Sequence, residues 1–451
     1  MTTESGDRSG WLPLLGSADG DRPLIWRDRR AVPVSEFMAH VEMLTARLPV
    51  SGAMINLCRS RHAFMVAFVA ALLRNHPTLM PASRAAGVVD ELLHSQPDAY
   101  AVDDAFVQCH APASGAIGNS DRAKAARDPA LAAFTSGTTG EPGCHFKTWG
   151  AISRCAANDA AQVRARLAAA GDSRDPAIVA TVPSQHMYGF ETAIMMSLIA
   201  AMSLHDSQPL LPAEVAAALA AVPEPRVLIT TPLHLRALCE SGTRFPLVAL
   251  LLSATAPLSR EAALAAETTF GCPLLEMFGS TETCVIAARE TARQTRWSAY
   301  REVSLRTVVD GTWVSAPWLT APVRLLDVMD LHGPDFELCG RHADLLEIAG
   351  KRASLAEITR RLLNLPGVHD AVVFQPEPPR DGQVARLAAL VVAPGINSAQ
   401  LLRGLAGVVD PAFLPRPLLL VRELPRNETG KLPREQLLQT MQSALRGHTP
   451  D

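Results

Sequence analysis

The sequence lacks the features that mark several large classes of protein. Its 451 residues carry a formal net charge of only −3 and 19% of them are charged, so a polyelectrolyte partner such as nucleic acid is not expected. The eight cysteines include no Cys-x-x-Cys pair and no His/Cys cluster at metal-ligand spacing. A chain of this length needs no disulfides either, so a reducing cytoplasm is the simplest location.

Long hydrophobic runs are also missing. The two longest, around residues 63–73 and 193–204, reach about a dozen residues, whereas a membrane-spanning helix needs about 20. We expect both runs to form buried helices, and we expect no membrane span. The first residues, MTTESGDRSG, lack a basic segment followed by an apolar one and are not typical of a secretory signal.

Hydrophobic residues, by contrast, make up 48% of the chain, and their pattern predicts an α/β fold. Apolar stretches of strand length alternate with stretches of helical periodicity. The predicted strands cover residues 54–57, 177–182, 227–230, 248–252 and 274–278. Helices are predicted over residues 37–48, 213–221 and 260–268.

At 48.2 kDa the chain exceeds one ordinary domain. We expect residues 1–341 to form a large domain with several sheets and residues 342–451 to form a smaller α+β domain. Ser354 and Glu357 have the Ser-x-x-Glu form of a capping box and predict a helix that ends before Pro366. Strands over residues 371–374 and 387–392 and a last helix near residue 433 follow.

The first candidate motif is rich in glycine and threonine. Residues 134–143 read Phe-Thr-Ser-Gly-Thr-Thr-Gly-Glu-Pro-Gly, and such small residues let the backbone approach an anion while hydroxyls and amides donate to phosphate oxygens. No Gly-Lys-Ser/Thr follows, so this is not a Walker loop. The alternative is an ordinary Ser/Thr/Gly turn.

A second motif, Met-Phe-Gly-Ser-Thr-Glu at residues 277–282, follows a predicted strand. Open α/β sheets bind their ligands at strand ends. An aromatic ring, a hydroxyl and a carboxylate within this motif could stack on a base, contact a phosphate and hold Mg²⁺. A strand-end turn with a capping threonine is the alternative.

A third motif, at residues 424–431, places Lys431 after a glycine turn. A lysine at such a position is usually a solvated surface charge. Its functional use would be as a cation that stabilises the charge developing between a carboxylate and an α-phosphate.

Together the three motifs resemble, in their order along the chain, the acyl-adenylate-forming superfamily of acyl-CoA synthetases, aryl-CoA ligases, luciferases and peptide-synthetase adenylation domains. The resemblance is specific from about residue 131 to residue 437. It implies a large adenylation domain, a small mobile domain, and a reaction that uses ATP and Mg²⁺. Lys431 would be the catalytic lysine, Thr281 would contact the α-phosphate, and Glu282 would bind magnesium.

The resemblance also implies the remaining site residues. Asp327 and Arg341 would hold the ribose, with Asp330 as the alternative to Asp327. His186, in a Pro-x-x-His-x-x-Gly segment, would lie beside the acyl carboxylate, although a buried histidine is more often a core residue. Tyr188, Gly189 and Phe190 would line the acyl pocket or simply pack in the core. The other residues expected to contact the nucleotide are Thr135, Ser136, Gly137, Thr138, Thr139, Gly140, Ser253, Ala254, Thr255, Phe278, Gly279 and Ser280.

Two positions depart from the family pattern. Gly143 stands where the phosphate loop normally has lysine, and the nearest cation is Lys147 in the segment Cys-His-Phe-Lys-Thr-Trp. This segment resembles small ligases of aryl-polyene and xanthomonadin pigment pathways, which implies that Lys147 reaches the phosphates instead. Ala343 stands where the family carries the hinge Asp or Lys.

We therefore expect an acid-thiol ligase. It would adenylate a carboxylic acid, of hydroxybenzoate-like aromatic type, and transfer the acyl group to the phosphopantetheine thiol of an acyl carrier protein. The short chain and the Lys147 segment favour the carrier protein. The alternatives are a ligase that uses free CoA and a degenerate protein that binds nucleotide or acyl groups without turnover, against which Glu282 and Lys431 argue.

Overall fold

The computed structural model describes residues 10–81, 83–108, 123–135, 143–308, 311–341, 345–348, 351–376, 387–427 and 432–447. Its contacts divide the chain into two compact units. Unit 1 comprises Met1–Ala254, Leu264–Glu290 and Pro317–Thr320, and unit 2 comprises Thr255–Ala263, Thr291–Ala316 and Ala321–Asp451. This division follows contacts in space and has no single boundary along the chain, so the functional boundary after residue 341 stays a prediction.

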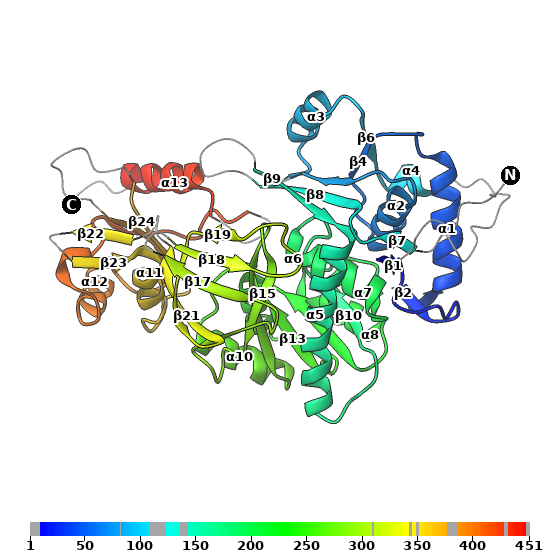
Figure 1. The fold of residues 1–451 in the computed structure, drawn as a ribbon. Helices are drawn as coiled ribbons and strands as arrows, with labels where there is room; N and C mark the ends of the chain where they lie inside the picture. The colour runs from blue at the N-terminus through cyan, green and yellow to red at the C-terminus, as the bar shows by residue number, and fades with distance from the viewer. Residues whose placement is uncertain are drawn as a thin grey trace, which may run out of the picture. The chain divides into compact units, whose positions relative to one another are not determined.

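Unit 1 is built mainly on parallel strands (Figure 1). One set runs in the order β15 (Cys284–Arg289), β14 (Leu274–Ser280), β13 (Leu250–Ser253), β12 (Arg226–Thr230), β10 (Ala177–Ala180), β11 (Ser203–His205), β2 (Pro23–Arg27) and β3 (Arg30–Pro33). A second sheet has the order β6 (Ala99–Val102), β4 (Ala53–Asn56), β5 (Thr78–Met80), β8 (Pro129–Thr135) and β9 (Gly143–Thr148). The short strands β1 (Trp11–Pro13) and β7 (Ala123–Ala125) pair with each other.

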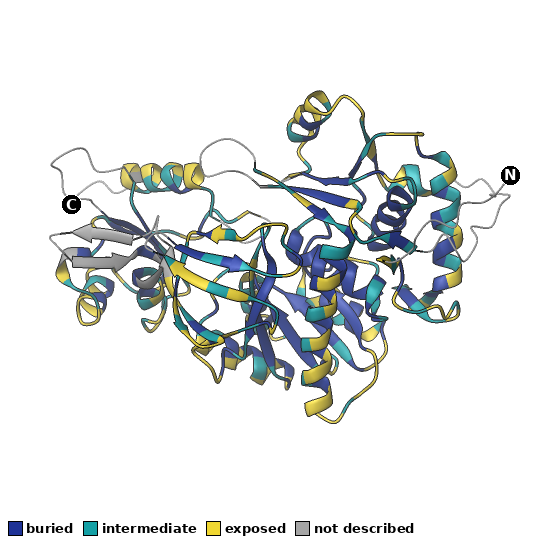
Figure 2. Ribbon diagram, viewed as in Figure 1, coloured by how far each residue is buried: buried dark blue, intermediate teal, exposed yellow. Residues whose placement is uncertain are grey.

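Helices cover these strands and bury them. The helices are α1 (Val34–Arg47), α2 (Arg61–Leu73), α3 (Ala86–Ser95), α4 (Asp104–Gln108), α5 (Trp149–Ala169), α6 (Met187–Gly189), the π-helix η2 (Phe190–Met195), α7 (Met196–Ile199), α8 (Pro212–Ala220) and α9 (Pro232–Glu240). The helix α10 (Arg260–Phe270) belongs to unit 1 from Leu264 onward. The long helix α5 packs on β13 and β15. Figure 2 shows the strands beneath it as buried, and the near-continuous apolar sequence of the parallel strands β10, β12 and β13 is typical of strands covered on both faces.

Unit 2 is smaller and has short sheets. Its strands are β16 (Trp297–Ala299), β17 (Ser304–Val308), β18 (Gly311–Ser315), β19 (Val323–Leu325), β20 (Asp327–His332), β21 (Asp335–Arg341), β22 (Leu345–Ile348), β23 (Lys351–Ser354), β24 (Asp370–Phe374), β25 (Ala388–Val392) and β26 (Leu418–Leu420). Its helices are α11 (Leu355–Leu363), α12 (Ser398–Ala406), the 3₁₀ turn η4 (Pro411–Phe413) and α13 (Arg434–Gly447). Ile358 and Leu362 of α11 pack with Val373 and Val391 in its core.

The predicted α/β class is confirmed, and each predicted strand and helix has a counterpart within a few residues. The buried helix expected over residues 193–204 is wrong in its second half, because the helix ends at Ile199. Ala201 takes a φ of 58°, and the strand β11 begins two residues later, parallel to β10 and β2. A short apolar run does not distinguish a buried strand from a buried helix. None of the helices in the described ranges is both long and apolar enough to span a membrane.

Candidate functional site

The second sequence motif forms the turn between the antiparallel strands β14 and β15 of unit 1. Ser280 and Thr283 close this turn. The Ser280 N–H donates to Thr283 Oγ1, and the Thr283 N–H donates to Ser280 Oγ, each at 3.2 Å. Thr281 and Glu282, the predicted phosphate and metal residues, lie between them and are half-buried. The turn therefore presents both side chains at the carboxyl end of β14.

Two side chains from elsewhere in unit 1 hold the backbone of this turn. The Lys147 ammonium, from β9, donates to the carbonyl oxygen of Glu282. The Trp318 indole N–H donates to the carbonyl oxygen of Thr283 at 2.9 Å. Both donors are buried, so each satisfies a backbone acceptor that water would otherwise have to reach. These contacts fix the turn from two directions.

Gly279 sits at an irregularity of the strand register just before the turn. A Cβ atom at this position would lie 2.2 Å from the carbonyl oxygen of Cys284, which is backbone and cannot move alone. We predict that Gly279→Ala costs roughly 1–3 kcal/mol of stability through overpacking and also lowers activity. Gly87→Ala is the matched control because a Cβ there meets nothing within 4 Å. Equal melting temperatures for the two variants would contradict this prediction.

The Glu282 carboxylate has the electrostatic environment of a cation ligand. Burial raises its pKa, but hydrogen bonds from Ser280 and from its own backbone N–H, together with nearby His145 and Lys147, outweigh that effect and hold the pKa below the ordinary 4.5. His145 Nε2 lies 3.4 Å from Glu282 Oε1. An ionised, half-exposed carboxylate is the ligand type that Mg²⁺ prefers, so this residue fits the predicted ion.

The first motif connects β8 to β9. Residues 136–142, which include the predicted phosphate-binding residues Ser136 to Gly140, lie outside the described residues. Thr135 pairs with Gly143 in the antiparallel register, so the two ends of this loop are adjacent. His145 and Lys147 alternate along β9 and share one face of the strand, because side chains two residues apart point the same way. That face meets the Glu282 turn, whereas the role of Lys147 with phosphates stays a prediction.

The predicted acyl segment forms α6 and the start of η2. His186 is the half-buried residue before α6, and a Cβ at Gly189 would lie 2.2 Å from the Pro183 carbonyl oxygen, so only glycine fits this bend. The Tyr188 hydroxyl is buried and has no hydrogen-bond partner among the described residues, which suits a group that awaits a ligand. Phe190 is fully buried and packs edge-on against Phe68 with ring centroids 5.0 Å apart. Its packing favours the core alternative.

The predicted adenine loop begins at the end of β13. Ser253 is the last residue of that strand and is fully buried, and its hydroxyl likewise finds no partner in the described part of the chain. Ala254 is buried beside it. Thr255 is exposed and has a φ of 84°, a region that a β-branched residue rarely adopts. Such strain often marks a ligand-binding loop.

In unit 2, the strand register brings two predicted ribose residues together. Asp327 is the direct cross-strand partner of Arg341 in the β20–β21 pair, whereas Asp330 pairs with Glu337. The pairing brings the backbones of residues 327 and 341 side by side at one end of the two strands. The register is the one expected if Asp327 and Arg341 serve one site, and the choice of Asp327 over Asp330 stays a prediction. Residue 431, the predicted catalytic lysine, and Ala343 lie outside the described residues.

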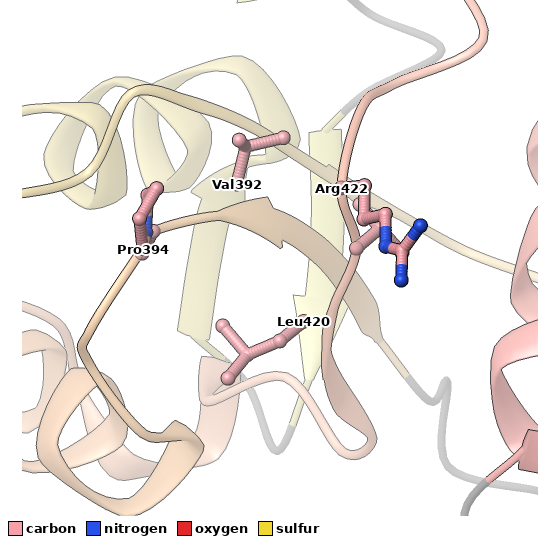
Figure 3. Close-up of a pocket in the computed structure, with 6 residues that line it drawn as sticks. Val392, Pro394, Leu420 and Arg422 are labelled. Atoms are coloured by element: carbon pink, nitrogen blue, oxygen red, sulfur yellow. The ribbon is translucent and has the colours of Figure 1, made fainter.

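Sequence reasoning missed a buried polar cluster in unit 1. Cys155 of α5, Glu191 of η2 and Cys284 of β15 place their sulfur and oxygen atoms within 4.8 Å of one another. These residues are far apart in the sequence and match no motif, so only the fold brings them together. A shallow hollow in unit 2, where β25 and β26 end, contains none of the predicted residues (Figure 3).

Comparison of the fold with solved structures shows which class of protein shares it. O-succinylbenzoate coenzyme A synthetase from Bacillus subtilis, in complex with AMP, superposes with a TM-score of 0.79 over 95% of this chain and 98% of that chain, at 17% identity. ATP-bound MatB from Rhodopseudomonas palustris gives 0.76 over 94% and 96% at 19% identity. The anthranilate CoA ligase AuaEII in complex with anthranoyl-AMP gives 0.76 over 97% and 98% at 13% identity. These likenesses show that the chain has the fold of such ligases.

The family itself follows from the sequence. Residues 47–312 match the model of the AMP-binding enzyme family, and the chain belongs to that family. A comparison with curated proteins found no match. The predictions of an enzyme and of the adenylate-forming family are therefore confirmed. The predicted cofactors are confirmed in kind, since the family binds AMP and a structure of the B. subtilis synthetase holds ATP and a magnesium ion.

Proposed function

We propose that this enzyme uses ATP and Mg²⁺ to convert a carboxylic acid to its acyl-adenylate and then transfers the acyl group to a thiol. The observation that carries the proposal is the braced turn at residues 280–285. It holds an ionised Glu282 beside Thr281 at the carboxyl end of β14, in a chain of the AMP-binding family. A degenerate protein that only binds nucleotide would not need hydrogen bonds and nearby cations that keep the Glu282 carboxylate ionised despite its partial burial.

In the first half-reaction, an oxygen of the substrate carboxylate attacks the α-phosphorus of ATP, and the bond to pyrophosphate breaks. Magnesium, when bound at Glu282, supplies charge neutralisation for the phosphates. Thr281 donates its hydroxyl to the α-phosphate, and Lys431 stabilises the negative charge that develops between acid and phosphate. His186 orients the acid carboxylate. Positioning and electrostatics, rather than acid–base chemistry, carry this step.

In the second half-reaction, a thiol attacks the acyl carbonyl, and AMP leaves. We propose a hydroxybenzoate-like aromatic acid as the substrate and the phosphopantetheine of an acyl carrier protein as the thiol, as in the small ligases of aryl-polyene and xanthomonadin pathways. Two structural neighbours bear the names of ligases for aromatic acids, which supports the first point. The same names specify CoA, and this favours free CoA as the second candidate acceptor.

A cytoplasmic location is part of this proposal. Seven cysteines in the described ranges are free, and burial raises the pKa of several of them, including Cys58 and Cys272. Protonated, buried thiols of this kind persist in a reducing compartment.

Carboxylate-dependent ATP/pyrophosphate exchange, measured with aromatic, fatty and amino acids, tests the proposed function. We expect exchange with one or a few hydroxybenzoate-like acids and little with the others. With the best acid, the rate of thioester formation is then compared between free CoA and a phosphopantetheinylated carrier protein. The carrier protein without phosphopantetheine is the control. Faster acylation of the loaded carrier is expected. Exchange with fatty acids alone would contradict the substrate class, and faster thioester formation with CoA would contradict the carrier.

A further inference from the structure

Glu191 is a buried carboxyl group that the proposed chemistry does not use. It lies on the π-helix η2, and its side chain is about 3% exposed. Both of its carboxyl oxygens accept from the backbone N–H of Val285, at 3.1 and 3.2 Å. Asp159 and Cys155 from α5 and Cys284 from β15 surround it. A carboxyl group from one element thus holds the backbone of another in the interior of unit 1.

Keeping a carboxyl group at this position is costly. Burial raises the pKa of Glu191 to about 7, even though the Val285 N–H, Asp159, Lys147 and Cys284 each act to lower it. An apolar side chain of similar size would avoid this desolvation. Buried carboxyl groups with such a shifted pKa concentrate at functional sites, so Glu191 is expected to have a task.

The contact that Glu191 makes explains what that task is. Val285 is the third residue after Glu282 and the first after Cys284, which has a φ of 62°. A non-glycine residue in this left-handed region needs its surroundings to hold it. Because Lys147 and Trp318 hold the two carbonyls just before Cys284, the Glu191 contact completes the set of supports around the strained residue.

The position of Glu191 in the chain links this turn to the acyl segment. It follows His186 and Gly189 by five and two residues, in a π-helix, a rare structure that is frequent at functional sites. On the basis of the proposed function, we propose that Glu191 is a positioning residue that couples the acyl-binding segment to the turn carrying Thr281 and Glu282. A movement of the acyl-binding segment is transmitted to the turn through the hydrogen bond from the Val285 N–H to Glu191.

A metal site is the competing use of this cluster, since two thiols and a carboxylate are a possible set of zinc ligands. The geometry favours positioning, because both oxygens of Glu191 already accept from Val285. A stoichiometric zinc ion in the purified enzyme, measured by elemental analysis, would overturn the positioning role. We expect none.

Hydrogen–deuterium exchange tests the contact without any need for turnover. Glu191→Leu removes the acceptor but keeps an apolar volume, and Glu191→Gln keeps one acceptor oxygen. Ser197→Ala is the matched control, because Ser197 is buried on the neighbouring helix α7 and its hydroxyl donates to the Ala193 carbonyl oxygen of the preceding helical turn. We expect the peptide covering residues 281–286 to exchange at least about tenfold faster in Glu191→Leu, and near the wild-type rate in the other two variants. An unchanged rate in Glu191→Leu would overturn the inference.

Kinetics test the coupling. We expect Glu191→Leu to raise KM for both the acid and ATP and to lower kcat in pyrophosphate exchange about tenfold, with a melting temperature equal to or above that of the wild type. Glu191→Gln should restore most of the activity. A purely structural role would instead lower activity and melting temperature together, and wild-type kinetics in Glu191→Leu would refute the coupling. If the wild type shows no exchange with any acid, the proposed function is wrong, while the deuterium measurement still decides the role of Glu191 in the turn.

The pH dependence of stability gives a second readout of the same group. The pKa of about 7 in the folded chain lies above the ordinary 4.5, so the stability that protonated Glu191 contributes is present below pH 4.5 and is lost as the pH rises through 7. We therefore expect the wild-type melting temperature to fall relative to Glu191→Gln between pH 5 and 8. The groups that face Glu191, namely Asp159, Cys155, Cys284 and Lys147, are the same in both proteins. If the melting temperatures of the wild type and of Glu191→Gln changed with pH in the same way, Glu191 would not be the buried carboxyl group that the inference requires.

Discussion

Glu282→Gln is expected to lower carboxylate-dependent ATP/pyrophosphate exchange by at least about a hundredfold. Glutamine keeps the size of the side chain but removes the negative charge that the turn maintains against burial. The loss of a charged ligand should weaken magnesium binding, so the magnesium concentration needed for half-maximal exchange should rise as well. Exchange rates measured across a magnesium titration separate these two effects.

The matched control for this substitution is Glu240→Gln, at the exposed end of α9. It removes the same charge far from the β14–β15 turn in sequence and should leave exchange within about twofold of the wild type, as is usual for surface substitutions. The backbone supports of the turn come from Lys147 and Trp318 and do not depend on the Glu282 side chain. A folded Glu282→Gln protein with full exchange at every magnesium concentration would remove this residue from the site.

Lys431→Ala is expected to lower the adenylation half-reaction by about 10²–10³-fold, the usual effect of losing one charge-stabilising group in a transition state. The second half-reaction should survive, because thiol attack on a preformed acyl-adenylate does not need this cation. The two halves can be measured separately, as pyrophosphate exchange and as thioester formation from synthetic acyl-adenylate.

Arg446→Ala provides the control for Lys431, since it removes an exposed cation from α13, near the same end of the chain. We expect wild-type rates in both half-reactions for this variant. If Lys431→Ala slowed both half-reactions equally, the lysine would have a general role in stability or binding. Full exchange in that variant would contradict its assignment to adenylation.

The sequence was sufficient to predict five strands of unit 1, because a parallel strand buried on both faces is a short, nearly continuous apolar run with polar neighbours. β10, β12, β13 and β14 all have this form. The same signal failed at residues 193–204, where one apolar run contains the end of a helix and the first two residues of a strand. A run of apolar residues shows that the segment is buried, but it does not show whether the buried backbone is a helix or a strand.

The residues with local motifs were also predictable, whereas their supports were not. Thr281 and Glu282 lie in a hexapeptide whose residue types alone indicate its chemistry. Glu191 contacts the Val285 backbone across 94 positions of sequence, and no spacing rule connects the two. Lys147 illustrates an intermediate case. Its motif indicated a functional cation, but only the fold shows that its ammonium binds the carbonyl of Glu282.

The central claim, that the acid is activated as an adenylate, is tested most directly with a substrate whose carboxylate oxygens are ¹⁸O. In adenylation, one of these oxygens becomes the bridge to the α-phosphorus, and thiol attack then breaks the bond between that oxygen and the acyl carbon. We therefore predict that mass spectrometry of the products will find one ¹⁸O atom in AMP for each thioester formed, and none in pyrophosphate. Label in inorganic phosphate, with ADP as the nucleotide product, would contradict the account.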